Sequence, residues 1–221
     1  MHISILMNMD RRWLLPLLLP VVALMGCGNA AVASAESKAE STSGVFAPTP
    51  TAFKAKGSHL ETAYFAGGCF WGLEYRFRAV KGVTATAVGY AGGHTENPSY
   101  EEVCTHTTGH AETALVEFDP ETVSYKQIAT LFFTDFHNPT TMNRQGPDEG
   151  DSYRSVLFYS NDEQKKVGEA VRAETQKGLK SPIVTEFVPF KKFWPAETYH
   201  QNYITKTGHF LCPIEPPTKI K

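Results

Sequence analysis

The chain has 221 residues, of which 42% are hydrophobic and 20% are charged, as in an ordinary globular protein. The formal net charge of −2 gives no electrostatic reason to expect nucleic-acid binding. Four cysteines are too few for a disulfide scaffold in a chain of this length, so each cysteine is interpreted separately.

The N-terminal residues 1–27 have the pattern of an export signal. Arg11 and Arg12 precede an apolar run that is too short to favour a transmembrane helix. The run ends in the letters LMGC, which resemble the lipobox of bacterial lipoproteins and predict that Cys27 is lipidated on cleavage. The alternative is an ordinary secretory signal that is cleaved further along, near Ser34. Either signal predicts an exported protein, and lipidation would hold it on a membrane, facing the periplasm or the cell exterior.

The rest of the chain divides into a tether and one domain. Residues 28–58 are rich in Ala, Ser, Thr and Pro, so we expect a disordered linker without chemistry of its own. Residues 59–221 are numerous enough to bury a core and form the expected catalytic domain. Nothing in the sequence demands more than a monomer.

Periodicity predicts alternating strands and helices in this domain. Strands are expected over residues 61–66, 84–90, 111–118, 155–159 and 184–189. Helices are expected over residues 70–79, 99–104, 125–136, 162–177 and 196–204, the fourth capped by Asn161 and stopped by Gly178. The strands have a half-buried pattern, which favours a two-layer α+β sandwich of the ferredoxin-like type, with a mixed sheet, over a doubly wound parallel sheet.

The motif GGCFWG, residues 67–72, is the most informative stretch of the domain. It places Cys69 at a strand-to-helix turn, where unpaired N–H groups and the positive end of a helix favour a thiolate. Phe70 and Trp71 are suited to wall an apolar pocket beside the sulfur. We therefore interpret Cys69 as a nucleophile, the alternative being an inert core cysteine.

Other segments accompany this motif in the same domain. They are GYAGG (89–93), NPSYEEVC (97–104) running on to TGHAE (108–112), NRQGPD (143–148) with YRS (153–155), and FWPAETYHQ (193–201). Taken with GGCFWG, they resemble the A-type peptide methionine sulfoxide reductases over about residues 62–212, with the motifs in family order.

The resemblance implies a thiol redox cycle. The Cys69 thiolate attacks the sulfur of a methionine sulfoxide, and proton delivery to the oxygen releases methionine and leaves a sulfenic acid. The resemblance assigns the acid to Glu102, helped by the hydroxyls of Tyr90 and Tyr153. Glu102 can donate this proton only if burial raises its pKa, and its neighbour Glu101 would point about 100° away on a helix.

The resemblance also implies the substrate contacts and the reductant. Asp148 orients the substrate, Phe70 and Trp71 hold its terminal methyl group, and the S epimer at sulfur is the one reduced. Cys212, in the C-terminal tail, resolves the sulfenic acid as a disulfide, which an external dithiol such as thioredoxin reopens. No prosthetic cofactor or metal is implied.

Other interpretations remain open at this point. The rival enzyme is a thiol peroxidase or disulfide oxidoreductase that uses Cys69 and Cys212. The rival from another class is a non-catalytic lipoprotein that binds oxidised methionine in partner proteins. Cys104 is interpreted as a packed thiol or a substitute for Cys212, and its spacing to His106 and His110 raises zinc as a weaker alternative.

Overall fold

The computed structural model describes residues 49–51, 56 and 59–210. The predicted export signal, Cys27, most of the predicted tether and Cys212 lie outside the described residues. No helix in the described part is both long and apolar enough to cross a membrane.

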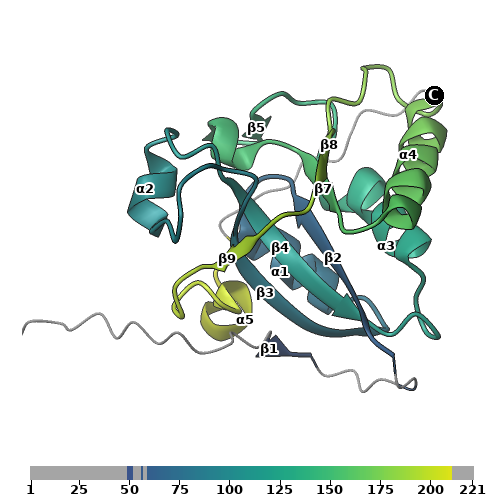
Figure 1. Ribbon diagram of the computed structural model, residues 1–221, viewed down its shortest axis with the longest axis horizontal. Coiled ribbons are helices and arrows are strands. Elements are labelled where there is room, and N and C mark those ends of the chain that lie inside the picture. Colours follow the sequence, from purple (N-terminus) through teal and green to yellow (C-terminus); the bar gives the residue numbers. More distant parts are fainter. Residues whose placement is uncertain (1–48, 52–55, 57–58, 211–221) are drawn as a thin grey trace, which may run out of the picture. The chain divides into compact units, whose positions relative to one another are not determined.

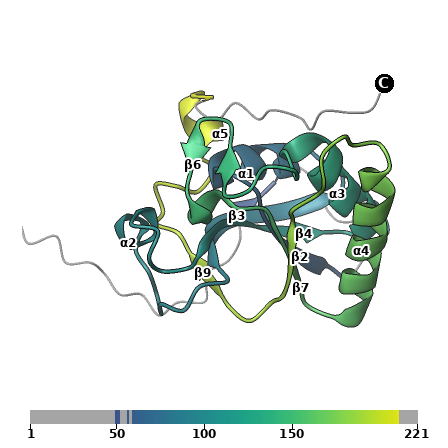
Figure 2. The same cartoon turned by 90° about the horizontal axis from the view of Figure 1, so that it is seen from above.

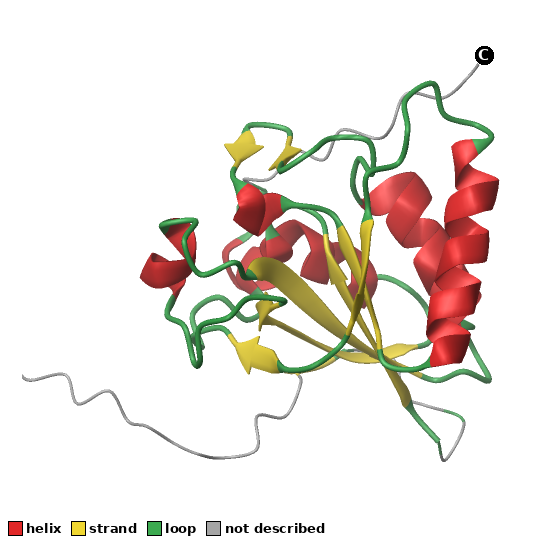
Figure 3. Ribbon diagram, turned by 45° about the horizontal axis from the view of Figure 1, so that its top comes forward, coloured by secondary structure: helices red, strands yellow, loops and turns green. Residues whose placement is uncertain are grey.

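The centre of the domain is a twisted sheet (Figures 1 and 3). Its four central strands are β2 (Glu61–Ala66), β3 (Val83–Ala91), β4 (Ala111–Phe118) and β7 (Val156–Tyr159). They lie in the order β3-β4-β2-β7, and every neighbouring pair is antiparallel. With a helix after β2 and another after β4, this is ferredoxin-like connectivity, and β8 (Glu186–Pro189) makes the sheet mixed by pairing parallel to β7. The predicted fold class is confirmed.

The helices pack mainly on one face of this sheet. Figure 2 shows α1 (Phe70–Arg78) and α3 (Tyr125–Leu131) on the same side, and α4 (Asp162–Gln176) contacts α3 and β7. A single π-helical turn, Phe132–Phe136, follows α3 directly. Asn161 caps α4 as predicted, because its side chain accepts a hydrogen bond from the Gln164 N–H at 2.8 Å.

The helix layer and the sheet bury an aromatic core between them. Phe65 of β2 stacks on Phe77 of α1 with ring centroids 5.1 Å apart, and both side chains are fully buried. Because burial of a phenylalanine contributes about 1.5–3 kcal/mol, contacts of this kind fix α1 on the sheet. The N-terminus of α1 is thereby fixed at the end of β2.

Strand β3 is more buried than the sequence pattern predicts. All nine of its residues are buried, whereas alternation predicted a half-buried strand. Two short strands cover it, one from before β3 in the chain and one from after it: β1 (Thr49–Pro50) and β9 (Phe193–Pro195) both pair with its outer side. The closing of an exposed edge by short strands is a common protection against unwanted pairing.

The last helix begins later than predicted. Residues 196–202 were expected to be helical, but α5 spans only Tyr203–Thr207. The Ala196 N–H and the Gln201 side chain bind the Val88 main chain at 2.9 Å, which ties the segment to the edge of β3. The tertiary contacts with β3 therefore override the local helical pattern here.

Candidate active site

Cys69 lies at the N-cap of α1, immediately after a turn of two glycines. Gly68 has φ = +85°, and a Cβ atom there would lie 2.6 Å from Cβ of Gln145. The Gly68 N–H donates to the Tyr153 carbonyl at 3.1 Å. Only glycine combines this positive φ with so close an approach, so the turn sets where the half-buried Cys69 side chain begins.

A buried histidine supports the other glycine of the turn. A Cβ atom at Gly67 would lie 2.8 Å from the ring of His137, which is fully buried. The ring nitrogens of His137 lie 2.7 Å from the Phe132 carbonyl and 2.6 Å from Oγ of Ser155. Burial lowers the pKa of His137 to about 3, so the ring is neutral and acts as a rigid support.

Glu112 lies directly beside the start of α1. It is one residue from Thr113, which pairs with Ala66 at the end of β2, so the register brings it next to the glycine turn. Its carboxyl oxygen Oε2 accepts a hydrogen bond from the Phe70 N–H at 2.9 Å. Glu112 is only 2% exposed, in a strand whose neighbouring side chains are otherwise mostly apolar.

The carboxyl group of Glu112 is held in its protonated form at neutral pH. Burial raises its pKa to about 8, although the Phe70 N–H acts in the opposite direction; the charge of Asp148 raises it further. A neutral Glu112 places a proton donor near Cys69 without adding a negative charge at the helix N-terminus. No acidic residue occupies the first turn of α1, so this end of the helix favours a thiolate.

Two tyrosine hydroxyl groups share this environment. Tyr153 is half-buried, and burial followed by the charges of Glu112 and Asp148 raises its pKa. Tyr100 is also half-buried, and burial, a hydrogen bond with Cys104 and the charge of Glu112 raise its pKa. Both hydroxyls therefore remain protonated across the physiological range and can donate hydrogen bonds.

The two aromatic residues that follow Cys69 pack against other aromatic rings. Phe70 is 1% exposed, and its ring centroid lies 5.9 Å from that of Tyr90. Trp71 is half-buried and stacks on Tyr203 of α5, with centroids 3.8 Å apart and ring planes 10° apart. The site thus has an apolar side, contributed by α1, next to the acidic group on β4.

The structure contradicts the burial expected for Glu102. Its side chain is exposed and accepts a hydrogen bond from the Ser99 N–H at 2.9 Å, while Oγ of Ser99 accepts from the Glu102 N–H at 3.2 Å. This reciprocal pair is a capping box that starts α2 (Tyr100–Cys104). Glu102 lacks the buried environment that its predicted role requires, and Glu101 is exposed as well.

Tyr90 lies near the site, but its hydroxyl group has another partner. It is fully buried on β3 opposite Glu112 and donates to Oε2 of Glu197 at 3.0 Å. The missed residues are therefore Glu112 and Tyr100. A carboxylate at the start of a largely apolar strand was the available signal for Glu112, and the end of the NPSY turn was the signal for Tyr100.

Asp148 lies on the separate β5–β6 hairpin, whose strands are Arg144–Gln145 and Asp148–Glu149 (Figure 3). It is half-buried, and burial raises its pKa. Its charge acts on both Glu112 and Tyr153. Asp148 and Cys69 therefore act on the same tyrosine, Tyr153, while the contact of Asp148 with a substrate stays a prediction.

The cysteine and histidines that raised zinc as an alternative have other partners. His110 accepts from the Gly93 N–H at 3.2 Å, and its Nε2 lies 2.8 Å from the Thr95 carbonyl, so the main chain uses both ring nitrogens. His106 lies 3.2 Å from Asp151 in the loop after β6. Within the described ranges, no three His, Cys, Asp or Glu residues are grouped to hold a metal ion.

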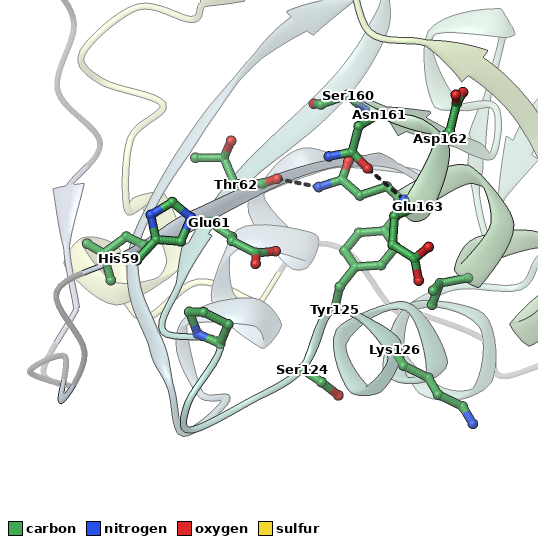
Figure 4. Close-up of a pocket in the computed structure, with 14 residues that line it drawn as sticks. His59, Glu61, Thr62, Ser124, Tyr125, Lys126, Ser160, Asn161, Asp162 and Glu163 are labelled. Atoms are coloured by element: carbon green, nitrogen blue, oxygen red, sulfur yellow. Dashed lines mark hydrogen bonds between the residues drawn. The ribbon is translucent and has the colours of Figure 1, made fainter.

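A wide groove also exists away from Cys69. It lies between the start of β2 and the first turns of α3 and α4, and Figure 4 shows polar residues such as Thr62 and Asn161 along it. Gln164 uses its amide to bind the Thr62 carbonyl at 2.9 Å. The groove is lined by no cysteine, so we assign the chemistry to the Cys69 site.

A half-buried cysteine at a helix N-terminus, with a protonated carboxyl group and two hydroxyl donors around it, defines a cysteine-nucleophile enzyme.

Comparisons with known proteins identify one family. Residues 61–221 match the family model for peptide methionine sulfoxide reductase. The chain is 54% identical over 173 residues to peptide methionine sulfoxide reductase MsrA of Methanosarcina acetivorans, a match covering 77% of this chain and 92% of that protein.

Solved structures agree with this match. Methionine sulfoxide reductase A of Corynebacterium diphtheriae superimposes with a TM-score of 0.65 at 32% identity, covering 76% of this chain and 85% of that one. Mxr1 of Saccharomyces cerevisiae in reduced form gives 0.64 at 32% identity, covering 75% and 96%. The chain belongs to the peptide methionine sulfoxide reductase family, and the prediction from the sequence motifs is confirmed.

The glycine turn gives a direct test of the site's construction. We expect Gly68→Ala to lower the free energy of unfolding by roughly 2 kcal/mol or more, because alanine is strained at positive φ and its Cβ meets Gln145. Gly178→Ala is the matched control, since its nearest non-neighbouring atom would lie 3.6 Å away, and we expect about zero to 1 kcal/mol of stabilisation. Urea unfolding of both variants measures this, and equal stability of the two would contradict it.

Proposed function

We propose that Cys69 reduces S-methionine sulfoxide, free or in proteins, with Glu112 as the proton donor. As a member of this family, the chain is an oxidoreductase that reduces peptide methionine sulfoxide in a thiol-dependent reaction. The observation that carries the residue assignment is the hydrogen bond from the Phe70 N–H to Glu112, which fixes a buried acid beside the cysteine.

The proposed first step transfers oxygen between two sulfur atoms. The Cys69 thiolate attacks the sulfoxide sulfur while Glu112 gives its proton to the sulfoxide oxygen. This attack forms a bond between the two sulfur atoms; the protonated oxygen then moves from the methionine sulfur to the Cys69 sulfur as that bond breaks, which leaves a sulfenic acid on Cys69 and releases methionine. Cysteine sulfur loses two electrons and methionine sulfur gains them, and Glu112 becomes a carboxylate that is reprotonated from water. Protonation is needed because a sulfoxide oxygen is a poor leaving group until it carries a proton or a strong hydrogen bond.

The surrounding side chains fit the remaining requirements of this step. The hydroxyls of Tyr100 and Tyr153 share the environment of Glu112 and would donate hydrogen bonds to the same oxygen without changing their charge. Phe70 and Trp71 would hold the terminal methyl group of the substrate. Asp148, half-buried on its hairpin, would orient the polar part of methionine.

The geometry favours sulfoxide reduction over the two rival functions. A peroxidase does not need an apolar wall for a methyl group, whereas Phe70 and Trp71, which follow Cys69 directly and have ring centroids 6.4 Å apart, would supply one. A module that only binds oxidised methionine does not need a buried acid with a pKa near 8. Both the acid and the aromatic wall are explained by turnover of a methyl sulfoxide.

We further propose that Cys212 resolves the sulfenic acid. Its thiol would condense with the Cys69 sulfenic acid to form a disulfide and water, and an external dithiol of the thioredoxin type would then reduce that disulfide. We propose a single resolving step, through Cys212. Cys104, exposed and hydrogen-bonded to Tyr100, is the alternative resolving thiol.

The location of the enzyme is a separate proposal. The LMGC letters support lipidation of Cys27, with residues 28–58 as a tether between the membrane and a monomeric domain over residues 59–221. An exported enzyme needs a dithiol reductant outside the cytoplasm. Intact mass and membrane fractionation of Cys27→Ser test the anchor: the variant should lack the lipid mass and leave the membrane fraction, and unchanged fractionation would contradict it.

The pH dependence of the first step tests the role of Glu112. Its proton is present below a pKa of about 8 and is lost as the pH rises through that value, so the single-turnover rate should fall about tenfold per pH unit above it. The single-turnover rate of Glu112→Gln should be lower by about 10²–10⁴-fold, and it should not fall further as the pH rises through this range. Glu102→Gln is the matched control, because glutamine also fits a capping box, and it should keep the parental profile. Equal losses in the two variants would refute the assignment.

The order of the two thiol steps is tested without reductant. The unmodified chain should release about one methionine per enzyme and form a Cys69–Cys212 disulfide. Cys69→Ser should release none, while Cys212→Ser should release one and keep a sulfenic acid that a trapping reagent captures. Intact mass measures each product. Methionine release by Cys69→Ser would overturn the nucleophile, and a disulfide to Cys104 in the unmodified chain would overturn the role of Cys212.

A further inference from the structure

His200 makes a direct contact with the substrate-pocket tryptophan, although no step of the proposed mechanism uses it. The indole Nε1–H of Trp71 donates to Nδ1 of His200 at 3.0 Å. The His200 side chain is 1% exposed, and its ring lies among Phe70, Trp71 and Tyr100, at centroid distances of 5.1, 5.5 and 4.5 Å. The segment after β9 therefore reaches two residues on α1 and one on α2.

This hydrogen bond defines the tautomer of His200. A tryptophan indole can only donate, so Nδ1 must accept and the ring proton must lie on Nε2. Nε2 is buried and makes no hydrogen bond with the described residues; Oε2 of Glu197 lies 3.9 Å away. Burial lowers the pKa of His200, which favours the neutral ring that this hydrogen bond needs.

The main chain on the C-terminal side of His200 is held firmly. The Gln201 side chain accepts from the Val88 N–H and donates to the Val88 carbonyl, both at 2.9 Å. The Asn202 N–H donates to Oε2 of Glu74 at 2.7 Å, and Glu74 is 1% exposed on α1. Gln201 and Asn202 thus fix the backbone that follows His200, so the imidazole ring is a rigid hydrogen-bond acceptor.

Trp71 is constrained in two independent directions. The stack on Tyr203 holds one face of the indole, at 3.8 Å between centroids, but stacked rings can still rotate within their common plane. The hydrogen bond to His200 removes that rotation, because it fixes the direction of the Nε1–H bond. The orientation of the indole edge beside Cys69 therefore depends on His200.

We propose that His200 is a positioning residue that sets the in-plane orientation of Trp71 and thereby the fit of the pocket to the substrate's methyl group. This inference rests on the proposed function, in which Trp71 walls the methyl site. Glu197 belongs to the same segment and accepts from the Tyr90 hydroxyl at 3.0 Å and from the Tyr100 N–H at 2.9 Å. The segment thus positions one wall of the pocket through Trp71 and the start of α2 through Tyr100.

Two complementary substitutions of His200 separate the effect of its hydrogen bond to Trp71 from the effect of its ring packing. His200→Phe keeps a buried aromatic ring and removes the acceptor. His200→Asn loses part of the ring, but its Oδ1 occupies about the position of Nδ1 and can accept from Trp71. Single-turnover reduction of a peptide-bound S-methionine sulfoxide over a range of concentrations gives a maximal rate and a half-saturating concentration for each full-length variant.

We expect His200→Phe to raise the half-saturating concentration about threefold to tenfold, the effect of one lost hydrogen bond. Its maximal rate should stay within about twofold, because the methyl contact is made equally before and during the reaction. His200→Asn should lie within about twofold of the unmodified chain in both quantities. An unchanged His200→Phe, or a His200→Asn that is as impaired as His200→Phe, would overturn the proposal.

A double-mutant cycle tests whether His200 acts through Trp71. In a Trp71→Phe background there is no indole N–H, so adding His200→Phe should change the half-saturating concentration by less than about twofold. A further threefold or larger loss would show that His200 acts by another route and would overturn the proposal. The unmodified chain assayed in parallel separates the two ideas, because absence of reduction there would refute the proposed function itself.

Discussion

The site depends on one hydrogen bond, from the Phe70 N–H to the carboxyl group of Glu112 at 2.9 Å. It joins the first turn of α1 to the start of β4. Its environment depends on three separate features: the register of β2 and β4, the conformation of the glycine turn, and the burial of Glu112 away from solvent. The register places Glu112 next to the end of β2. Burial then raises the pKa of that carboxyl to about 8, which turns a structural contact into a proton donor.

The glycine turn follows the end of β2, next to the start of β4 where Glu112 lies. Gly68 adopts φ = +85°, and Gly67 leaves room for the neutral ring of His137. Strained turns and buried polar groups of this kind cost stability, and they are typical of functional sites. The aromatic core between Phe65 and Phe77 offsets that cost by fixing α1 on the sheet. The packed aromatic core thus stabilises a site whose glycine turn and buried polar groups are themselves unfavourable.

Much of the fold and part of the site could be predicted from the sequence, and the errors have physical causes. Alternation gave β4 its observed bounds, Ala111–Phe118, and the GGCFWG letters located the nucleophile at the start of α1. The resemblance assigned the acid to Glu102, but motif letters do not report burial, and the exposed Glu102 side chain forms a capping box with Ser99 instead. Glu112 could not be identified as the acid from local sequence, because its position beside α1 depends on the pairing of β2 with β4, which are distant in the chain. The late start of α5 has the same origin, since Gln201 binds β3 rather than its own helix.

The central claim is that Glu112 is protonated at neutral pH, and infrared difference spectroscopy measures this without catalysis. Spectra of the full chain, taken as the pH is raised from about 6 to about 10, should lose one buried carboxylic acid carbonyl band around pH 8. The same band should be missing from Glu112→Gln and present in Glu102→Gln. If no carboxylic acid band is present at neutral pH, or if it persists in Glu112→Gln, then Glu112 is not the buried acid and the account is contradicted.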